Sequence, residues 1–154
     1  MRVINPDDIL SALWDRLNGD PVFRGMVESI NKGPKRPNPP PGETKPVNPS
    51  ATVHLLTAPV DPELDSIRST AIVNVYMNDL PNGQMDADGL GKRAKRVQEL
   101  FHKAHLPTHP EGPLTAPYLR FRTVYVTEPL FLPSDVEGEH LASVRLSMIV
   151  EAKE

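Results

Sequence analysis

The sequence contains no cysteine, which excludes a disulfide framework, a thiol nucleophile and a thiolate metal site. Aromatic residues make up only 5% of the 154 residues, and no apolar run approaches the roughly 18 residues that a membrane-spanning helix needs. Basic residues are not in excess either. The formal net charge of -3 argues against a protein whose main task is to grip nucleic acid. Residues 1–5 show no signal-peptide core, so we expect the protein to stay in the cytosol where it is made.

Proline, in contrast, is abundant, with 18 residues in the chain. Residues 31–50 contain prolines at positions 34, 37, 39, 40, 41, 46 and 49, together with Lys35 and Arg36. Such a composition favours extended or disordered chain over packed structure. We therefore predict a long Pro-rich loop, for which two interpretations remain open. One is a plain surface loop, and the other is an arm that is mobile in the free subunit and becomes ordered on a neighbouring subunit.

The rest of the chain has the composition of one globular domain, 1–154, with 38% hydrophobic and 24% charged residues. Asn5-Pro6-Asp7-Asp8 has a side-chain cap, a first-turn proline and acids near the helix dipole, which predicts a helix from there to Leu17. A second helix is predicted over 88–104. It has an apolar face and a basic face, and the basic face consists of Lys92, Arg93, Lys95 and Arg96.

Alternation of apolar and polar residues predicts two long strands in the segment 119–151, joined as a wide hairpin by a loop containing Pro129 and Pro133. Strands are also predicted over 51–58 and 70–78, and a short one over 22–30. The expected fold is α+β: a mostly antiparallel sheet of about four strands, with both helices on one face. The strand 70–78 and the strand from Leu119 are the candidates for a parallel pair, which would make the sheet mixed.

No constellation of residues predicts catalysis or a cofactor. His102, His105 and His109 suggest a metal site, but Pro107 interrupts their spacing, so we expect no metal. In the calcium-loop pattern around Asp86, Lys95 would occupy the place of the closing acid, which excludes that motif. Because the carboxylates are dispersed and no Ser-His-Asp spacing stands out, we expect a protein that is not an enzyme.

Three groups of residues are candidates for contacts with a partner. The basic helix face has three interpretations: a solvated surface, a surface for an acidic partner, or a contact with nucleic-acid backbone. Protein contacts fit better than base stacking, because no aromatic residue lies among these cations. Apolar residues between the two hairpin prolines are the first candidates for subunit contact, although they have the alternative of folding back onto the sheet. The candidates are Leu130, Phe131 and Leu132 at the hairpin tip, Lys92, Arg93, Lys95 and Arg96 on the helix, and Lys35 and Arg36 in the loop.

The order of these segments resembles the tail terminator (tail-completion) proteins of tailed bacteriophages. The likeness spans nearly the whole chain, and its residues lie at 9–13, at 71–76, in the helix after Asp88 and at 140–148. The resemblance implies a structural protein, made in the bacterial host cytoplasm, that forms a ring, usually a hexamer, at the tail–neck junction of the virion. Such a ring ends tube polymerisation and gives the neck a docking surface.

The partners that the resemblance implies are the tail tube protein and a neck or head-completion protein, with genomic DNA passing through without specific binding. The family has no catalytic motif to transfer. A neck or head-completion (head–tail joining) protein of the same virion is the main alternative. A small hydrolase or ligand-binding domain is the alternative from another functional class.

Overall fold

The computed structural model describes residues 4–57, 60–61 and 66–153. Its helices are α1 (Pro6–Gly19), α2 (Pro21–Arg24) and α3 (Ala87–Phe101). Its strands are β1 (Ser29–Lys32), β2 (Ser50–Thr57), β3 (Val60–Asp61), β4 (Ser66–Asn78), β5 (Thr115–Ala116), β6 (Leu119–Val126), β7 (Leu130–Pro133) and β8 (Glu139–Ala152). None of the described helices is long and apolar enough to cross a membrane.

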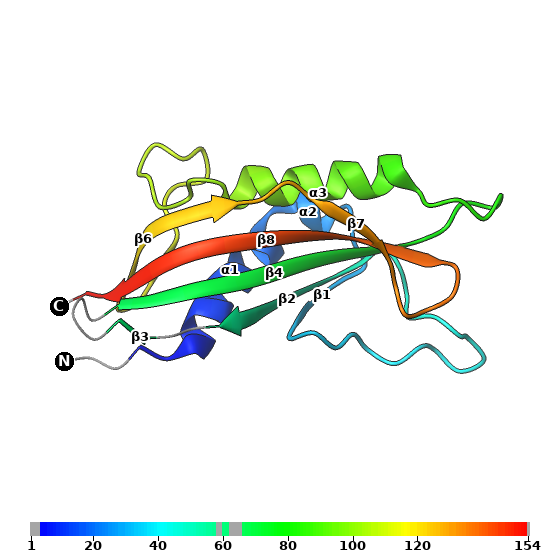
Figure 1. Ribbon diagram of the computed structural model, residues 1–154, viewed down its shortest axis with the longest axis horizontal. Helices are drawn as coiled ribbons and strands as arrows, with labels where there is room; N and C mark the ends of the chain where they lie inside the picture. The colour runs from blue at the N-terminus through cyan, green and yellow to red at the C-terminus, as the bar shows by residue number, and fades with distance from the viewer. Residues whose placement is uncertain (1–3, 58–59, 62–65, 154) are drawn as a thin grey trace.

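Within the described residues, eight strands form one mixed sheet. Its order is β1-β2-β4-β8-β6-β5, with β3 beside β4 and β7 beside β8 (Figure 1). The prediction of about four strands was too low. The additional strands are short, since β3 and β5 have two residues each and β7 has four. The long strand β8 pairs with β4 on one side and with both β6 and β7 on the other.

The predicted wide hairpin is confirmed, because β6 and β8 pair antiparallel. The predicted parallel pair was assigned to the wrong strands. Strand β8 lies between β4 and β6 and runs antiparallel to both, whereas β1 and β2 form the parallel pair. The strand predicted over 22–30 is also wrong in its first half, because Asp20 caps the short helix α2 through the Phe23 N–H, and strand pairing begins only at Ser29.

The two long helices form close to their predicted bounds. Helix α1 begins after Asn5, whose side-chain oxygen accepts the Asp7 N–H at 3.0 Å. Helix α3 begins after Asp86, which accepts the Gly89 N–H at 2.9 Å. It ends at Phe101 rather than at residue 104, and Lys103 then adopts a left-handed conformation with φ 57°.

Helices α1 and α3 pack on the same face of the sheet, as predicted, and bury one continuous core (Figure 1). The alternation of β4 and β8 places their apolar residues on this face. Core residues from the four main elements are Ile9, Leu13 and Leu17 of α1, Leu90, Val97 and Leu100 of α3, Ala71, Val73 and Val75 of β4, and Val144, Leu146 and Val150 of β8. The opposite face of the sheet carries none of the described helices.

Candidate interaction surface

Strand β7 presents three large apolar side chains to solvent at the edge of the sheet. Leu130, Phe131 and Leu132 are 59%, 37% and 37% exposed, and together they are called the β7 patch. The main chain of β7 pairs with β8, with Leu130 opposite Ser143 and Leu132 opposite Leu141. The hairpin tip therefore joins the sheet through its backbone but leaves these side chains available for contact.

The main chain of the β7 edge offers few hydrogen-bond donors. Ser134 donates its N–H to the Glu139 carbonyl at 3.1 Å. In an antiparallel pair, the N–H groups of successive residues point alternately toward and away from the partner strand. The N–H groups of Leu132 and Leu130 therefore face β8, and that of Phe131 faces outward. Pro129 and Pro133 have no N–H to present. This edge is therefore suited to side-chain packing rather than to the addition of another strand.

Acidic residues flank the β7 patch on both sides in sequence. Glu128 precedes it, and Asp135 and Glu137 follow it in the turn to β8. All three are exposed and make no ion pair within the described part of the chain. The three acids flank the apolar residues of the β7 patch and are together called the acidic rim.

The neighbouring edge strand β6 is capped by two histidines that follow α3. The Nδ1 atom of His105 accepts the Val124 N–H at 3.0 Å, and that of His102 accepts the Val126 N–H at 3.4 Å. Burial, with the charges of Lys103 and His102, lowers the pKa of His105, which favours the neutral ring that this acceptor role requires. These contacts occupy two outward-facing donors of β6.

The predicted basic face of α3 divides into two kinds of residue. Arg96 forms a bidentate pair with buried Asp20, at 2.6 and 2.8 Å, and Arg93 donates to the carbonyls of Met26 and Gly89. Lys95 is exposed without an ion pair among the described residues, and Lys92 makes only an exposed contact with Asp88 at 3.1 Å. The two lysines are therefore the cations of this face that are exposed to a partner.

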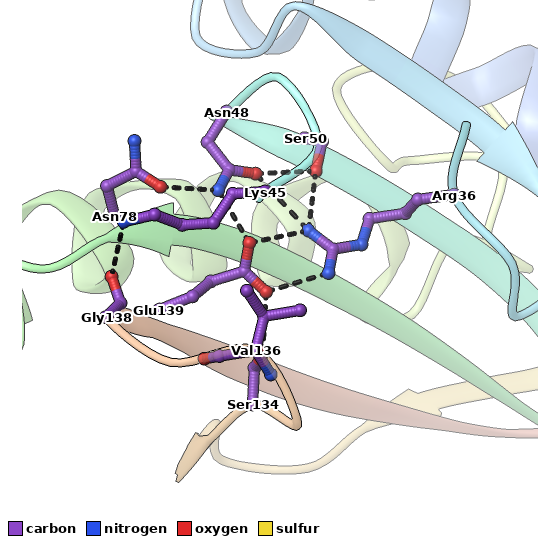
Figure 2. A network of polar contacts seen from close by, with 9 residues as sticks. All are labelled: Arg36, Lys45, Asn48, Ser50, Asn78, Ser134, Val136, Gly138 and Glu139. Atoms are coloured by element: carbon purple, nitrogen blue, oxygen red, sulfur yellow. Dashed lines mark hydrogen bonds and ion pairs between the residues drawn. The ribbon is translucent and has the colours of Figure 1, made fainter. Parts of the chain in front are cut away.

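The Pro-rich loop, residues 33–49, connects β1 to β2 and is anchored by a buried ion pair. Figure 2 shows Arg36 pointing from the loop toward Glu139 at the start of β8. The two guanidinium–carboxylate contacts measure 2.7 and 2.8 Å, and the side chains of Arg36 and Glu139 are 8% and 0% exposed. The guanidinium also lies 3.7 Å from the centre of the Tyr76 ring.

Two further side chains complete the coordination of Glu139 (Figure 2). Asn48 donates to its carboxylate at 2.7 Å and Ser134 at 2.6 Å. Burial is the largest single effect on the pKa of Glu139 and acts to raise it. The hydrogen bonds from Arg36, Ser134 and Asn48 together outweigh burial, so the pKa of Glu139 is lowered. The network joins the two ends of the loop, at Arg36 and Asn48, to the turn between β7 and β8.

Sequence reasoning named Arg36 but did not find Glu139, Asn48 or Ser134. Arg36 and Glu139 are 103 positions apart, and no local pattern links them. The one available signal was an acid at the first residue of a strand that alternates apolar and polar residues. Arg36 is occupied within the chain, whereas Lys35 beside it is exposed and unpaired in the described residues.

The histidines that suggested a metal are used in other contacts. His109 donates from Nε2 to the Glu99 carbonyl at 2.9 Å, and its Nδ1 accepts the Glu111 N–H at 3.1 Å. Within the described residues, no group of three or more histidines and acids could hold a metal ion. A surface pocket beside His105 contains Arg120, Arg122 and Lys153, and Glu151 is the acid that pairs with both arginines.

Comparison with known proteins identifies similar folds. No protein-family model matches the sequence, and no curated protein matches it significantly. One similar solved chain belongs to the virion of a native gene transfer agent (GTA) particle, with a TM-score of 0.62, 14% identity, and coverage of 93% of this chain and 94% of that chain. A second, from a protein without a descriptive name, has a TM-score of 0.53 and 15% identity, covering 98% and 97%. At these identities the likeness shows the fold.

Proposed function

We propose that this protein is a structural component of a phage-like virion and acts as a tail terminator. In this role it forms a ring on the end of the tail tube, stops tube polymerisation and provides the docking surface for the neck. The observation that carries the proposal is the match to a GTA virion chain over nearly the full length of both chains. The resemblance of the sequence to tail terminators supports the specific role.

The surface of the subunit supports an assembly role. A ring built from identical copies needs two complementary surfaces on each copy. The β7 patch with its acidic rim is one such surface: Leu130 and Leu132 are exposed on one face of this edge strand and Phe131 on the other, and exposed large apolar side chains are typical of a protein contact. Lys92 and Lys95 on α3 offer charge of the opposite sign.

The chemistry that we propose is binding alone, without catalysis. The strongest buried ionic group, Glu139, is fully engaged by Arg36, Asn48 and Ser134, so it serves the structure of the loop rather than a substrate. The pocket beside His105 is lined by three cations, Arg120, Arg122 and Lys153, and the Nδ1 atom of His105 is engaged by the Val124 N–H.

The direct test adds purified protein to tail tubes of its own virion and follows tube ends by electron microscopy. A terminator is expected to cap one end of each tube and to prevent elongation when more tube protein is added. Light scattering on the same mixture measures the mass of the bound ring. Protein that binds head particles and leaves tube growth unchanged would instead favour the neck or head-completion role.

A subunit that stays monomeric and binds neither tubes nor heads would contradict both assembly roles. A variant with serine at exposed Leu56, which lies outside the β7 patch, serves as the matched control for surface substitution. It should cap tubes as the unmodified protein does.

A further inference from the structure

We propose that the β7 patch of one copy receives the Pro-rich loop of the next copy. This inference rests on the proposed ring and specifies which two surfaces meet in it. The occupant is a second copy of this chain, through residues 37–47 of its loop. A segment of the tube protein is the competing occupant, and the experiment below distinguishes the two.

The sheet register places the base of the loop and the β7 patch in one row across the sheet. Ser50, where the loop enters β2, pairs with Tyr76 of β4. Tyr76 pairs with Leu141 of β8, and Leu141 pairs with Leu132 of β7. One row across the sheet thus runs from the end of the loop to the β7 patch. In Figure 1 the loop extends along the β1 side of the sheet and β7 lies on the other side.

Equal height is what a closed ring demands. In a heterologous contact, one surface of a copy meets the other surface of its neighbour, and the chain of contacts closes only if the operation is a pure rotation. If the strands run parallel to the ring axis, two surfaces in one row of the sheet lie at the same position along that axis. Neighbouring copies can then contact each other without a translation along the axis. Patches in different rows would generate a helix instead.

The main chains of the two segments are chemically matched. Covering a sheet edge ordinarily buries unpaired N–H groups, which is costly. Here Pro129 and Pro133 flank the patch, and between them Phe131 alone presents an outward N–H. The loop contains seven prolines, so it too has few donors to bury. The two surfaces can therefore pack through side chains without leaving many donors unpaired.

Side chains on the two segments are also complementary. The loop exposes Val47, 55% accessible, along with most of its prolines, and these suit the leucines of the patch. Its exposed Lys35 is unpaired in the described residues, and Lys45 reaches only the Gly138 carbonyl at 3.4 Å. Lys35 is opposite in sign to the acidic rim of the receiving surface, whereas Lys45 lies beside the β7–β8 turn of its own chain.

The loop is already shaped before it meets a neighbour. The Arg36–Glu139 pair holds one arm of the loop and Asn48 holds the other. At the tip, Glu43 donates its N–H to the Pro40 carbonyl at 2.9 Å, and Gly42 adopts the φ of +84° that this turn uses. A fixed loop loses less conformational entropy on docking than a disordered one.

The absence of cysteine allows a clean cross-linking test in rings assembled on tail tubes. One preparation carries Val47→Cys and another carries Phe131→Cys, and the two are mixed, assembled and oxidised. Because each chain has a single thiol, a disulfide between positions 47 and 131 can join only different copies. The matched control replaces Val47→Cys with Leu56→Cys, another exposed apolar residue.

Assembled rings of the 47 and 131 pair are expected to give about tenfold more heterodimer than the control pair, because docking holds the thiols at high effective concentration. Mass spectrometry of the linked peptide identifies the pair. Rings that form but give no excess over the control would overturn this inference and leave the proposed function standing. Open chains of copies with the specific link would support the inference and contradict the closed ring. Absence of both rings and links would reject the two together.

Discussion

At the scale of single residues, the Arg36–Glu139 pair is the costliest polar contact to disturb. Both side chains are almost fully buried, and Glu139 accepts from Asn48 and Ser134 as well. Removing one partner of such a pair leaves a buried charge without compensation. The pair fixes both the loop and the turn between β7 and β8, so its loss should affect each of them.

We predict that Glu139→Gln lowers the free energy of unfolding by about 3 kcal/mol or more at pH 7, because the Arg36 guanidinium stays buried without its countercharge. Urea denaturation followed by circular dichroism measures the change. Asp88→Asn is the control, since its pair with Lys92 is exposed and should contribute less than about 1 kcal/mol. Equal losses in the two variants would contradict this account.

The pH dependence of stability provides a separate prediction. A free glutamate titrates near pH 4.5, and the hydrogen bonds in the network lower the pKa of Glu139 in the folded protein, although burial opposes them. Its stabilising contribution is therefore complete above about pH 4.5 and is lost as the pH falls through the folded pKa. Melting temperatures measured downward from pH 6 should fall in the unmodified protein below that point and fall less steeply in Glu139→Gln.

At the scale of elements, helix α3 serves two purposes on one face. Its arginines tie it to α2 and to the chain before β1, since Arg96 binds Asp20 and Arg93 binds the Met26 carbonyl. Its lysines point to solvent. Reversing charge at Arg93 or Arg96 would therefore disturb folding as well as any partner contact. Contact between this face and a partner stays a prediction, and Lys92 and Lys95 are the residues that test it.

We predict that changing both Lys92 and Lys95 to Glu leaves the free energy of unfolding within about 1 kcal/mol of its original value. Assembly on tail tubes should weaken more at low salt than at high salt, because exposed charges are screened as ionic strength rises. Sedimentation of tube-bound protein across a salt series measures this. Arg96→Met is the contrasting variant, and it should lose about 3 kcal/mol because Asp20 remains buried without its partner. A salt-independent effect of the lysine changes would mean that the face is merely solvated.

The elements that sequence predicted well are those with strong local signals. The cap at Asn5 and the apolar stripe defined α1, and alternation defined the β6–β8 hairpin. Strand β1 was predicted only in part, as the end of a strand over 22–30, because it has only four residues and pairs in parallel with a strand beyond a 17-residue loop, which no short-range pattern encodes. Strand β7 was read as a loop because its prolines argued against a ladder, yet as an edge strand it needs few outward N–H groups.

In the candidate surface too, features with a local sequence signal were predicted and contacts between distant residues were not. The β7 residues were predicted from apolarity between prolines, and the structure places them at an edge, exposed. The anchoring of the loop could not be predicted, because it depends on a side-chain pair brought together by the sheet register. Mobility of the loop in the free subunit was one of two interpretations of the sequence, and the anchors at Arg36 and Asn48 favour a loop that is shaped before assembly. Hydrogen exchange in free and assembled protein distinguishes the two.

At the scale of the whole molecule, the β7 patch can be altered without loss of the fold. Leu130 and Leu132 are exposed, so changing both to Ser should change the free energy of unfolding by less than about 1 kcal/mol. Ring formation on tubes should be lost, because the apolar centre of the contact is gone. Light scattering of the assembled mixture measures this, with Leu56→Ser as the control. Normal rings from the double variant would remove the β7 patch from the interface.

The histidine caps on β6 and the prolines around β7 bear on how the free protein behaves before assembly. An uncapped strand edge can template the stacking of further copies without limit, as in amyloid fibres. Here the donors of Val124 and Val126 are already occupied, and β7 offers little main chain to extend. This side of the sheet is therefore a poor template for the addition of further strands. In the proposed ring, association would depend on side-chain contacts instead, and these are satisfied once each copy has two neighbours.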